Sequence, residues 1–217
     1  MPLFDPVSAV YAILALGKCP EAPAPAKIAV HIEEKRPTFN NDVPAEGFIS
    51  PAGSDAEAGQ EEFSVTGGML RGNLDIAYSV AFIQEKHAGG DRRCFWISKL
   101  DMTVVYVPEI YIAHEYTPGS CVYEEISGHE MKHVVFDMQV IRQFLPHLQT
   151  LMEGAVAAIG PRDPVSEDGI AGEEAAFKGV IEKAAEDALD SMREARVLRH
   201  AELDTSDEYT RLSEACP

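Results

Sequence analysis

The residues best suited to chemistry in this sequence are two histidines and a glutamate in one short motif. His129, Glu130 and His133 form a His-Glu-x-x-His pattern. On a helix, residues four apart share one face, so His129 and His133 can present two imidazole nitrogens to a single ion. In zinc hydrolases with this pattern the metal lowers the pKa of its water, and the glutamate accepts the proton. The motif therefore predicts a Zn²⁺ site with His129 and His133 as ligands and Glu130 as the catalytic base.

The element that must position this motif is a helix that begins near residue 121. Thr117-Pro118-Gly119-Ser120 is a typical helix start, with Ser120 as the N-cap. We expect Pro146 to kink or end this helix, with further helix to Ile159. Its apolar residues form two stripes, which predicts a helix buried between layers. The stripes are Val122, Ile126, His129, His133, Phe136 and Val140, and Met131, Val135, Met138, Ile141 and Leu145. Burying two imidazoles and a carboxylate without a ligand is costly, so this placement favours metal binding.

Alternating apolar and polar residues predict a sheet beside this helix. Residues 74–82 and 94–106 alternate on either side of the turn-rich Ala88-Gly89-Gly90-Asp91, which predicts a long antiparallel hairpin with one buried face. Residues 28–32 predict a further strand, and residues 35–60 a long loop. We expect Pro108-Glu109 to turn the chain. Residues 110–116 would then form an edge strand that could hold an extended peptide by strand addition, with His114 as a surface residue.

The C-terminal third predicts two more helices. Glu173 to Leu198 carries apolar residues at helical spacing, and Thr205-x-x-Glu208 is a capping box that opens a short last helix. The expected fold is therefore α+β, with a small antiparallel sheet packed against the buried motif helix and a second long C-terminal helix.

A third metal ligand is needed, because a catalytic zinc has three protein ligands and a water. Asp137 follows His133 by four residues, but on a continuous helix it lies about 12 Å along the axis from His129. We interpret Asp137 as a residue that orients a histidine ring, or as a solvated one. Other candidates stay open, although a solvated position is the simpler explanation for each of them. They are Glu153, Glu182, Glu186, His200 and Glu202.

Charge and the N-terminus limit the classes of function. The chain has 18 basic and 36 acidic residues, a formal net charge of −18, and no basic cluster with interleaved aromatics, which disfavours nucleic-acid binding. The apolar run Val7 to Leu16 has the length of a signal-peptide core and is too short to span a bilayer. We therefore expect residues 1–18 to be a signal peptide and 19–217 to form one domain. An N-terminal helix is the alternative, because residues 1–6 carry Asp5 and no basic residue.

The four cysteines favour disulfides in an oxidising compartment. None lies in a Cys-x-x-Cys pair, and three pairings are open to four cysteines. Cys19 and Cys216 lie near the two ends of the expected mature chain, whereas Cys94 opens a strand and Cys121 opens the motif helix. We therefore expect Cys19–Cys216 and Cys94–Cys121 bonds and a periplasmic or secreted protein. Free thiols in a cytoplasmic protein are the alternative.

The chain resembles a bacterial family of predicted secreted zinc-dependent proteases over residues 60–215. The resemblance rests on Gly67-Gly68, Cys94, Gly119-Ser120-Cys121-x-Tyr123 and His129-Glu130-x-x-His133-Val134. It implies a zincin-like α+β domain, a signal peptide and a periplasmic or extracellular location. The family's protease label rests mainly on the motif. Its tail often carries a histidine after an Asp/Thr stretch, where this chain has Tyr209, so the third ligand stays open.

Two functions follow from these patterns. The first is a zinc-dependent hydrolase of peptide or amide bonds that acts on a peptide or protein substrate. The second is a non-catalytic secreted metal-binding or interaction module, whose zinc site is structural or degenerate. Because a structural zinc has four protein ligands and a catalytic one leaves a position open, counting the ligands separates the two. A fortuitous motif in a cytoplasmic protein is a third hypothesis. The sequence leaves the oligomeric state open.

Overall fold

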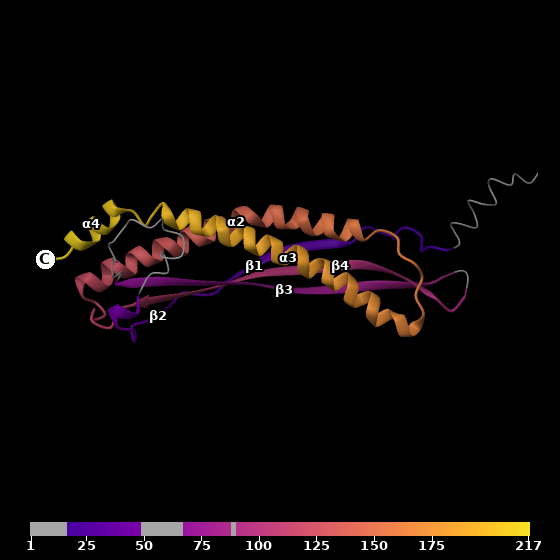
Figure 1. The fold of residues 1–217 in the computed structure, drawn as a ribbon, viewed down its shortest axis with the longest axis horizontal. Coiled ribbons are helices and arrows are strands. Elements are labelled where there is room, and N and C mark those ends of the chain that lie inside the picture. Colours follow the sequence, from indigo (N-terminus) through magenta and orange to yellow (C-terminus); the bar gives the residue numbers. More distant parts are fainter. Residues whose placement is uncertain (1–16, 49–66, 88–89) are drawn as a thin grey trace, which may run out of the picture. The chain divides into compact units, whose positions relative to one another are not determined.

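The computed structural model describes residues 17–48, 67–87 and 90–217. These residues form four strands, three α-helices and two short 3-10 helices (Figure 1). The elements in chain order are β1 (Lys27–Glu34), β2 (Thr38–Asn40), η1 (Ala45–Gly47), β3 (Gly68–Lys86), β4 (Arg93–Ile112), α2 (Cys121–Ile159), η3 (Glu167–Gly169), α3 (Ile170–Ala201) and α4 (Ser206–Glu214). The expected α+β class, with a sheet and two long helices, is confirmed.

The described residues cluster into two compact units. Unit 1 comprises residues 17–31, 76–87, 90–103 and 145–189, and unit 2 comprises residues 32–48, 67–75, 104–144 and 190–217. The strands β3 and β4 and the helices α2 and α3 each contribute residues to both units. The single domain that we expect over residues 19–217 stays a prediction. The expected signal peptide lies almost wholly in residues 1–16, outside the described residues.

The sheet is partly parallel, because β2 joins it. β4 pairs with β1, β2 and β3. β2 runs parallel to β4, with Phe39 opposite Ile110. The expectation of a purely antiparallel sheet is therefore wrong. The physical reason is that β2 lies in residues 35–60, where three residues carry too short a pattern to reveal a strand.

β4 continues through Pro108, where we expected a turn. Its even-numbered residues are buried on both sides of the proline, including Tyr106 and Ile110, each 0% exposed. A strand tolerates proline where its missing N–H is not needed, and the pairing with β2 begins at the next residue, Glu109. Residues 110–112 therefore lie within β4, and Ile110 and Tyr111 pair with β2, so the prediction of a free edge strand over 110–116 is wrong. His114 is exposed, as expected.

The motif helix α2 is one unbroken helix of 39 residues. Its N-terminus is capped as expected, since the Tyr123 amide donates to Ser120 Oγ at 3.3 Å. Pro146 lies within the helix and does not end it. One face of the helix is buried, and it carries His129, Glu130, His133, Val134, Asp137, Met138, Val140 and Ile141. Val135, which belongs to the expected second stripe, is 50% exposed.

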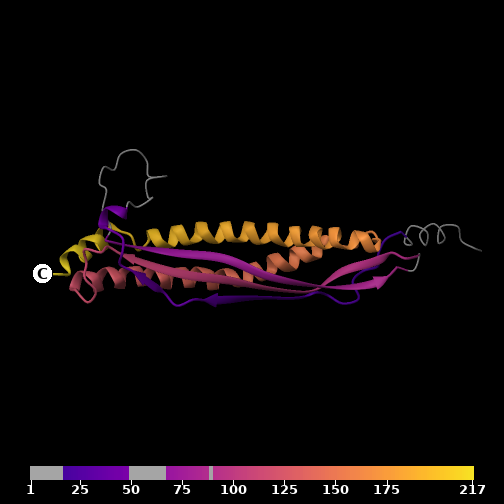
Figure 2. The same ribbon diagram turned by 90° about the horizontal axis from the view of Figure 1, so that it is seen from below.

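The C-terminal elements of unit 2 lie against the first turns of α2. Thr205 caps α4, because its Oγ1 accepts the Glu208 amide at 3.2 Å. Both ribbon views place α4 beside the start of α2 (Figures 1 and 2), and the Arg211–Glu125 ion pair at 3.0 Å joins the two helices. Among the described residues, no helix combines the length and apolar character that a membrane span requires.

The disulfides pair differently from our expectation. Cys19 bonds to Cys94 in unit 1, and Cys121 bonds to Cys216 in unit 2. The prediction of Cys19–Cys216 and Cys94–Cys121 is therefore wrong. It paired cysteines by their place along the chain, whereas the fold brings Cys19 beside β4 and the C-terminus beside the start of α2. Two disulfides are typical of a protein of an oxidising compartment.

Candidate metal centre

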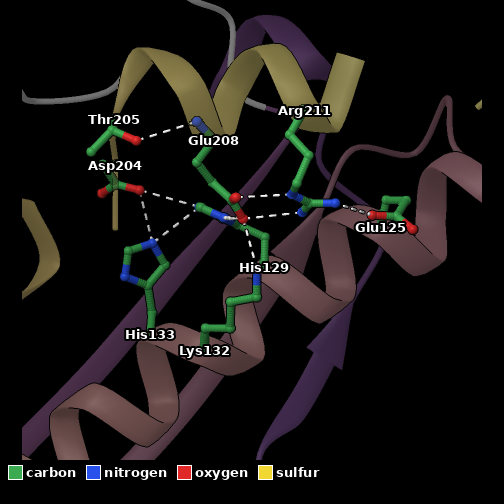
Figure 3. Close-up of polar contacts among 8 residues, drawn as sticks. All are labelled: Glu125, His129, Lys132, His133, Asp204, Thr205, Glu208 and Arg211. Atoms are coloured by element: carbon green, nitrogen blue, oxygen red, sulfur yellow. Dashed lines mark hydrogen bonds and ion pairs between the residues drawn. The ribbon is translucent and has the colours of Figure 1, made fainter. Parts of the chain in front are cut away.

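Three donor atoms converge in unit 2, two from α2 and one from the turn before α4. His129 Nε2 and His133 Nε2 lie 3.2 Å apart. Asp204 Oδ1 lies 3.2 Å from His129 Nε2 and 2.9 Å from His133 Nε2 (Figure 3). The two histidines are buried, at 4% exposure each, whereas Asp204 is exposed. His129, His133 and Asp204 therefore form a group that could hold a metal ion.

The separations in this group fit a tetrahedral zinc. Zn–N and Zn–O bonds of about 2.0–2.2 Å at tetrahedral angles place two ligand atoms roughly 3.3–3.6 Å apart. The three observed separations, 2.9, 3.2 and 3.2 Å, are slightly shorter than that. Two imidazoles and a carboxylate are also a donor set that zinc accepts. The donors thus need little rearrangement to share one ion.

Electrostatics also favour a cation at this point. Burial alone would lower the pKa of His129, but its hydrogen bonds with Asp204 and Glu208 and the charge of Glu130 outweigh burial and raise it. Burial by itself would raise the pKa of Asp204, but hydrogen bonds with both histidines hold it well below its usual range. The first shift arises because negative groups surround His129, and the second because two imidazoles contact Asp204. The same negative groups would attract a metal ion.

Glu130 lies in the same buried region, as the motif predicts. It is 5% exposed, and burial raises its pKa to about 7, although His129 and a hydrogen bond from the Leu70 backbone act in the opposite direction. Gly68 makes room for it. A Cβ at Gly68 would lie 3.0 Å from Glu130 Oε1 and would overlap Ile126. The start of β3 therefore packs closely against the carboxylate.

Asp204 is the donor that sequence reasoning missed. It lies 71 residues beyond His133, directly before Thr205, in a stretch that contains no histidine. The residue type alone made Asp204 a candidate, because aspartate ligates zinc as histidine does. The capping box predicts that Asp204 lies just before a helix, but no pattern in the sequence predicts that this helix lies close to the motif.

The other candidates for the third ligand take no part in the triad. Glu153, Glu182 and Glu186 belong to unit 1, where Glu153 bonds Gln149 and Glu182 accepts from Tyr78. In unit 2, Glu202 pairs with Arg199. His200 lies next to the triad without joining it. Its ring centroid is 4.6 Å from that of His133, and its Nε2 lies 2.6 Å from Asp137 Oδ1.

Asp137 is the centre of a buried polar network, and the interpretation of a solvated residue is wrong. It is 0% exposed, and Arg196 donates to both of its oxygens at 2.7 and 2.6 Å. Tyr106 donates to it at 2.6 Å. Burial alone would raise the pKa of Asp137, but the hydrogen bonds from His200 and Arg196 lower it to about 2. Asp137 does orient a histidine ring, but that ring is His200 and not one of the motif pair.

A cavity of about 380 Å³ adjoins the triad. Glu130 and all three donors line it, together with Tyr209. Apolar side chains from the start of β3, the first turns of α2 and α4 also line it: Met69, Leu70, Val122, Ile126 and Leu212. The three donors therefore border a space larger than a water molecule.

We found no match for this chain among protein-family models, curated proteins or solved structures.

Proposed function

We propose that this protein is a zinc-dependent hydrolase of peptide or amide bonds. His129, His133 and Asp204 would hold the ion, and Glu130 would serve as general base. The observation that carries the proposal is the convergence of three zinc donors on the wall of a cavity that also contains a buried carboxylate. A zinc ion held there would supply the Lewis acidity that activates water and polarises a carbonyl group.

The residues of the chain have separate tasks in this reaction. Glu130 accepts a proton from the attacking water and returns it to the leaving amine. Its buried position beside Gly68 and Leu70 holds the carboxylate in place. Tyr209 lines the cavity, and burial, the charge of Asp204 and a hydrogen bond with Asp204 raise its pKa well above the usual value, so its hydroxyl stays protonated. Its task is to hold the Asp204 carboxylate at the metal site.

The number of donors supports catalysis over a structural zinc. A structural site is closed by four protein ligands, whereas a catalytic site has three and an open position. Among the described residues the candidate group contains three, and the cavity lies next to them. His200, the nearest further imidazole, is engaged by Asp137 through Nε2.

The cavity also supports a peptide or amide substrate. Its described lining combines apolar side chains with Glu130 and Asp204 and includes no lysine or arginine. Such walls suit apolar side chains beside a carbonyl group and disfavour anionic ones. The resemblance to predicted secreted zinc-dependent proteases and a periplasmic or secreted location accord with this proposal, and the two disulfides add support for such a location.

The test is a comparison of Glu130→Gln with wild-type protein. Zinc content is measured by elemental analysis, and cleavage is measured on a library of fluorogenic peptides. We expect Glu130→Gln to keep its zinc and lose hydrolysis, because the amide cannot accept a proton. His129→Ala should lose the zinc, whereas His31→Ala, an exposed histidine of unit 1, should resemble wild type. Undiminished hydrolysis by Glu130→Gln would overturn the mechanism.

A further inference from the structure

The side chain of Glu208 does not make the hydrogen bond that a capping box predicts for it. In a capping box the glutamate side chain bonds back to the amide of the cap residue. Here the Thr205 amide donates to the Leu203 carbonyl instead, at 2.8 Å. Glu208 points toward the motif helix, where its Oε1 lies 3.3 Å from His129 Nδ1 (Figure 3). Its side chain is therefore available for another task.

Two cations hold the Glu208 carboxylate in that position. Lys132 Nζ donates to Oε1 at 2.7 Å, and Arg211 donates to Oε2 at 2.9 Å and to Oε1 at 3.0 Å. The Glu208 side chain is only 15% exposed, although the two cations are each 46% exposed. Lys132 comes from α2 and Arg211 from α4, so the carboxylate is anchored from both helices.

This contact determines which nitrogen of His129 faces the metal centre. A carboxylate only accepts hydrogen bonds, so His129 Nδ1 must donate to Glu208. Nε2 is then the ring nitrogen left to bind an ion, and it lies near Asp204 Oδ1 and His133 Nε2. His133 differs, because its buried Nδ1 has no hydrogen-bond partner among the described residues. Glu208 thus orients one of the two motif histidines.

We propose that Glu208 is the positioning residue of the metal centre: it fixes the His129 ring with Nδ1–H toward itself and Nε2 toward the ion. Carboxylates that orient ligating histidines typically contribute about 10- to 100-fold to metal affinity. This inference rests on the same three donors as the proposed function and adds a fourth residue to them. It also explains why Lys132 and Arg211 converge on one carboxylate of a strongly acidic chain.

The experiment measures zinc affinity of the full chain by competition with a chromogenic chelator. We expect Glu208→Ala to weaken zinc binding by about 10- to 100-fold. The matched control is Glu125→Ala, which removes the other carboxylate partner of Arg211 without touching His129. It should bind zinc within about twofold of wild type. Equal losses in the two variants would mean that Glu208 acts only by docking α4, and would overturn the proposal.

A second readout does not depend on zinc. In metal-free protein with ¹⁵N-labelled histidine, NMR shows whether Nδ1 of His129 carries a proton. We expect a proton on Nδ1 in wild type and in Glu125→Ala, and its loss in Glu208→Ala, where only Nε2 still faces a carboxylate, that of Asp204. A proton that stays on Nδ1 in Glu208→Ala, together with unchanged affinity, overturns the role of Glu208 alone. A wild-type chain that binds no zinc overturns the metal centre, and with it the proposed function.

Discussion

The two units bury different kinds of residues. Among the described residues, all four buried polar or charged side chains belong to unit 2 and lie on nine consecutive residues of α2: His129, Glu130, His133 and Asp137. Unit 1 has an apolar interior, with one cluster around Phe95, Ile97 and Phe177 and another around the Cys19–Cys94 disulfide and Trp96. Buried charges cost free energy unless they are paired or coordinate a metal.

The cavities of the two units show the same difference. The unit 1 cavity, of about 410 Å³, is lined mainly by apolar groups such as Phe95, Trp96 and Phe177. The unit 2 cavity, of about 380 Å³, contains two imidazoles, Glu130 and Asp204. The residues around the unit 1 cavity are explained by apolar packing alone. The second cavity contains the three donors that could hold a metal ion, so the candidate site lies in unit 2.

The largest effect on stability should come from breaking the buried network of unit 2. Asp137→Ala leaves Arg196, whose side chain is 12% exposed, without its carboxylate. Removing one partner of a buried pair costs about 3–5 kcal/mol. In unit 1, Glu173→Gln removes the partner of Arg162 from a more exposed pair and should cost less than about 1 kcal/mol. Urea denaturation measures the free energy of unfolding of both variants. Equal losses in Asp137→Ala and Glu173→Gln would contradict the difference between the units.

The disulfides should also respond differently. Cys19 and Cys94 are 5% and 2% exposed, whereas Cys121 is exposed and Cys216 half-buried. Under mild dithiothreitol we expect the Cys121–Cys216 bond to open first, because a thiolate must reach the sulfur. α4 has no buried residues, so it would loosen and Asp204 would hold zinc less tightly. Loss of such a native bond costs about 2–5 kcal/mol.

Alkylation followed by mass spectrometry gives the order of reduction, and chelator competition gives the zinc affinity. The matched variants are Cys121→Ser/Cys216→Ser and Cys19→Ser/Cys94→Ser. Only the first pair should weaken zinc binding. Earlier labelling of Cys19 and Cys94 would contradict the difference in access between the units.

The smallest effect is the pH dependence of stability that arises from Asp137 in unit 2. The folded-state pKa of Asp137, about 2, is below its ordinary value of 3.8. Its contribution to the free energy of unfolding is therefore complete above pH 3.8 and is lost as the pH falls toward 2. It amounts to about 2 kcal/mol, from a shift of nearly two units at about 1.4 kcal/mol each. Asp137→Asn should lack this pH-dependent part. Urea denaturation at pH 5 and pH 2.5 tests it, with Glu173→Gln expected to follow wild type.

Local patterns in the sequence predicted most of the elements. The alternation in β3 and β4, the Ser120 cap of α2 and the Thr205 cap of α4 each depend on neighbours within a few residues. The pairing of His129 with His133 also follows from one helical turn, and their Nε2 atoms do converge. Each of these features is determined over short distances along the chain, so a single sequence is enough to read it.

Only the tertiary structure decided the contacts between distant residues. Asp204 joins the triad across more than 70 residues, and the two disulfides close separations of 75 and 95 residues. β2 and the path of β4 through Pro108 likewise depend on which strands lie side by side. Many pairings satisfy the same local pattern, and packing of the whole chain selects among them. The sequence thus predicted two of the three candidate metal donors, and only the fold showed the third, Asp204.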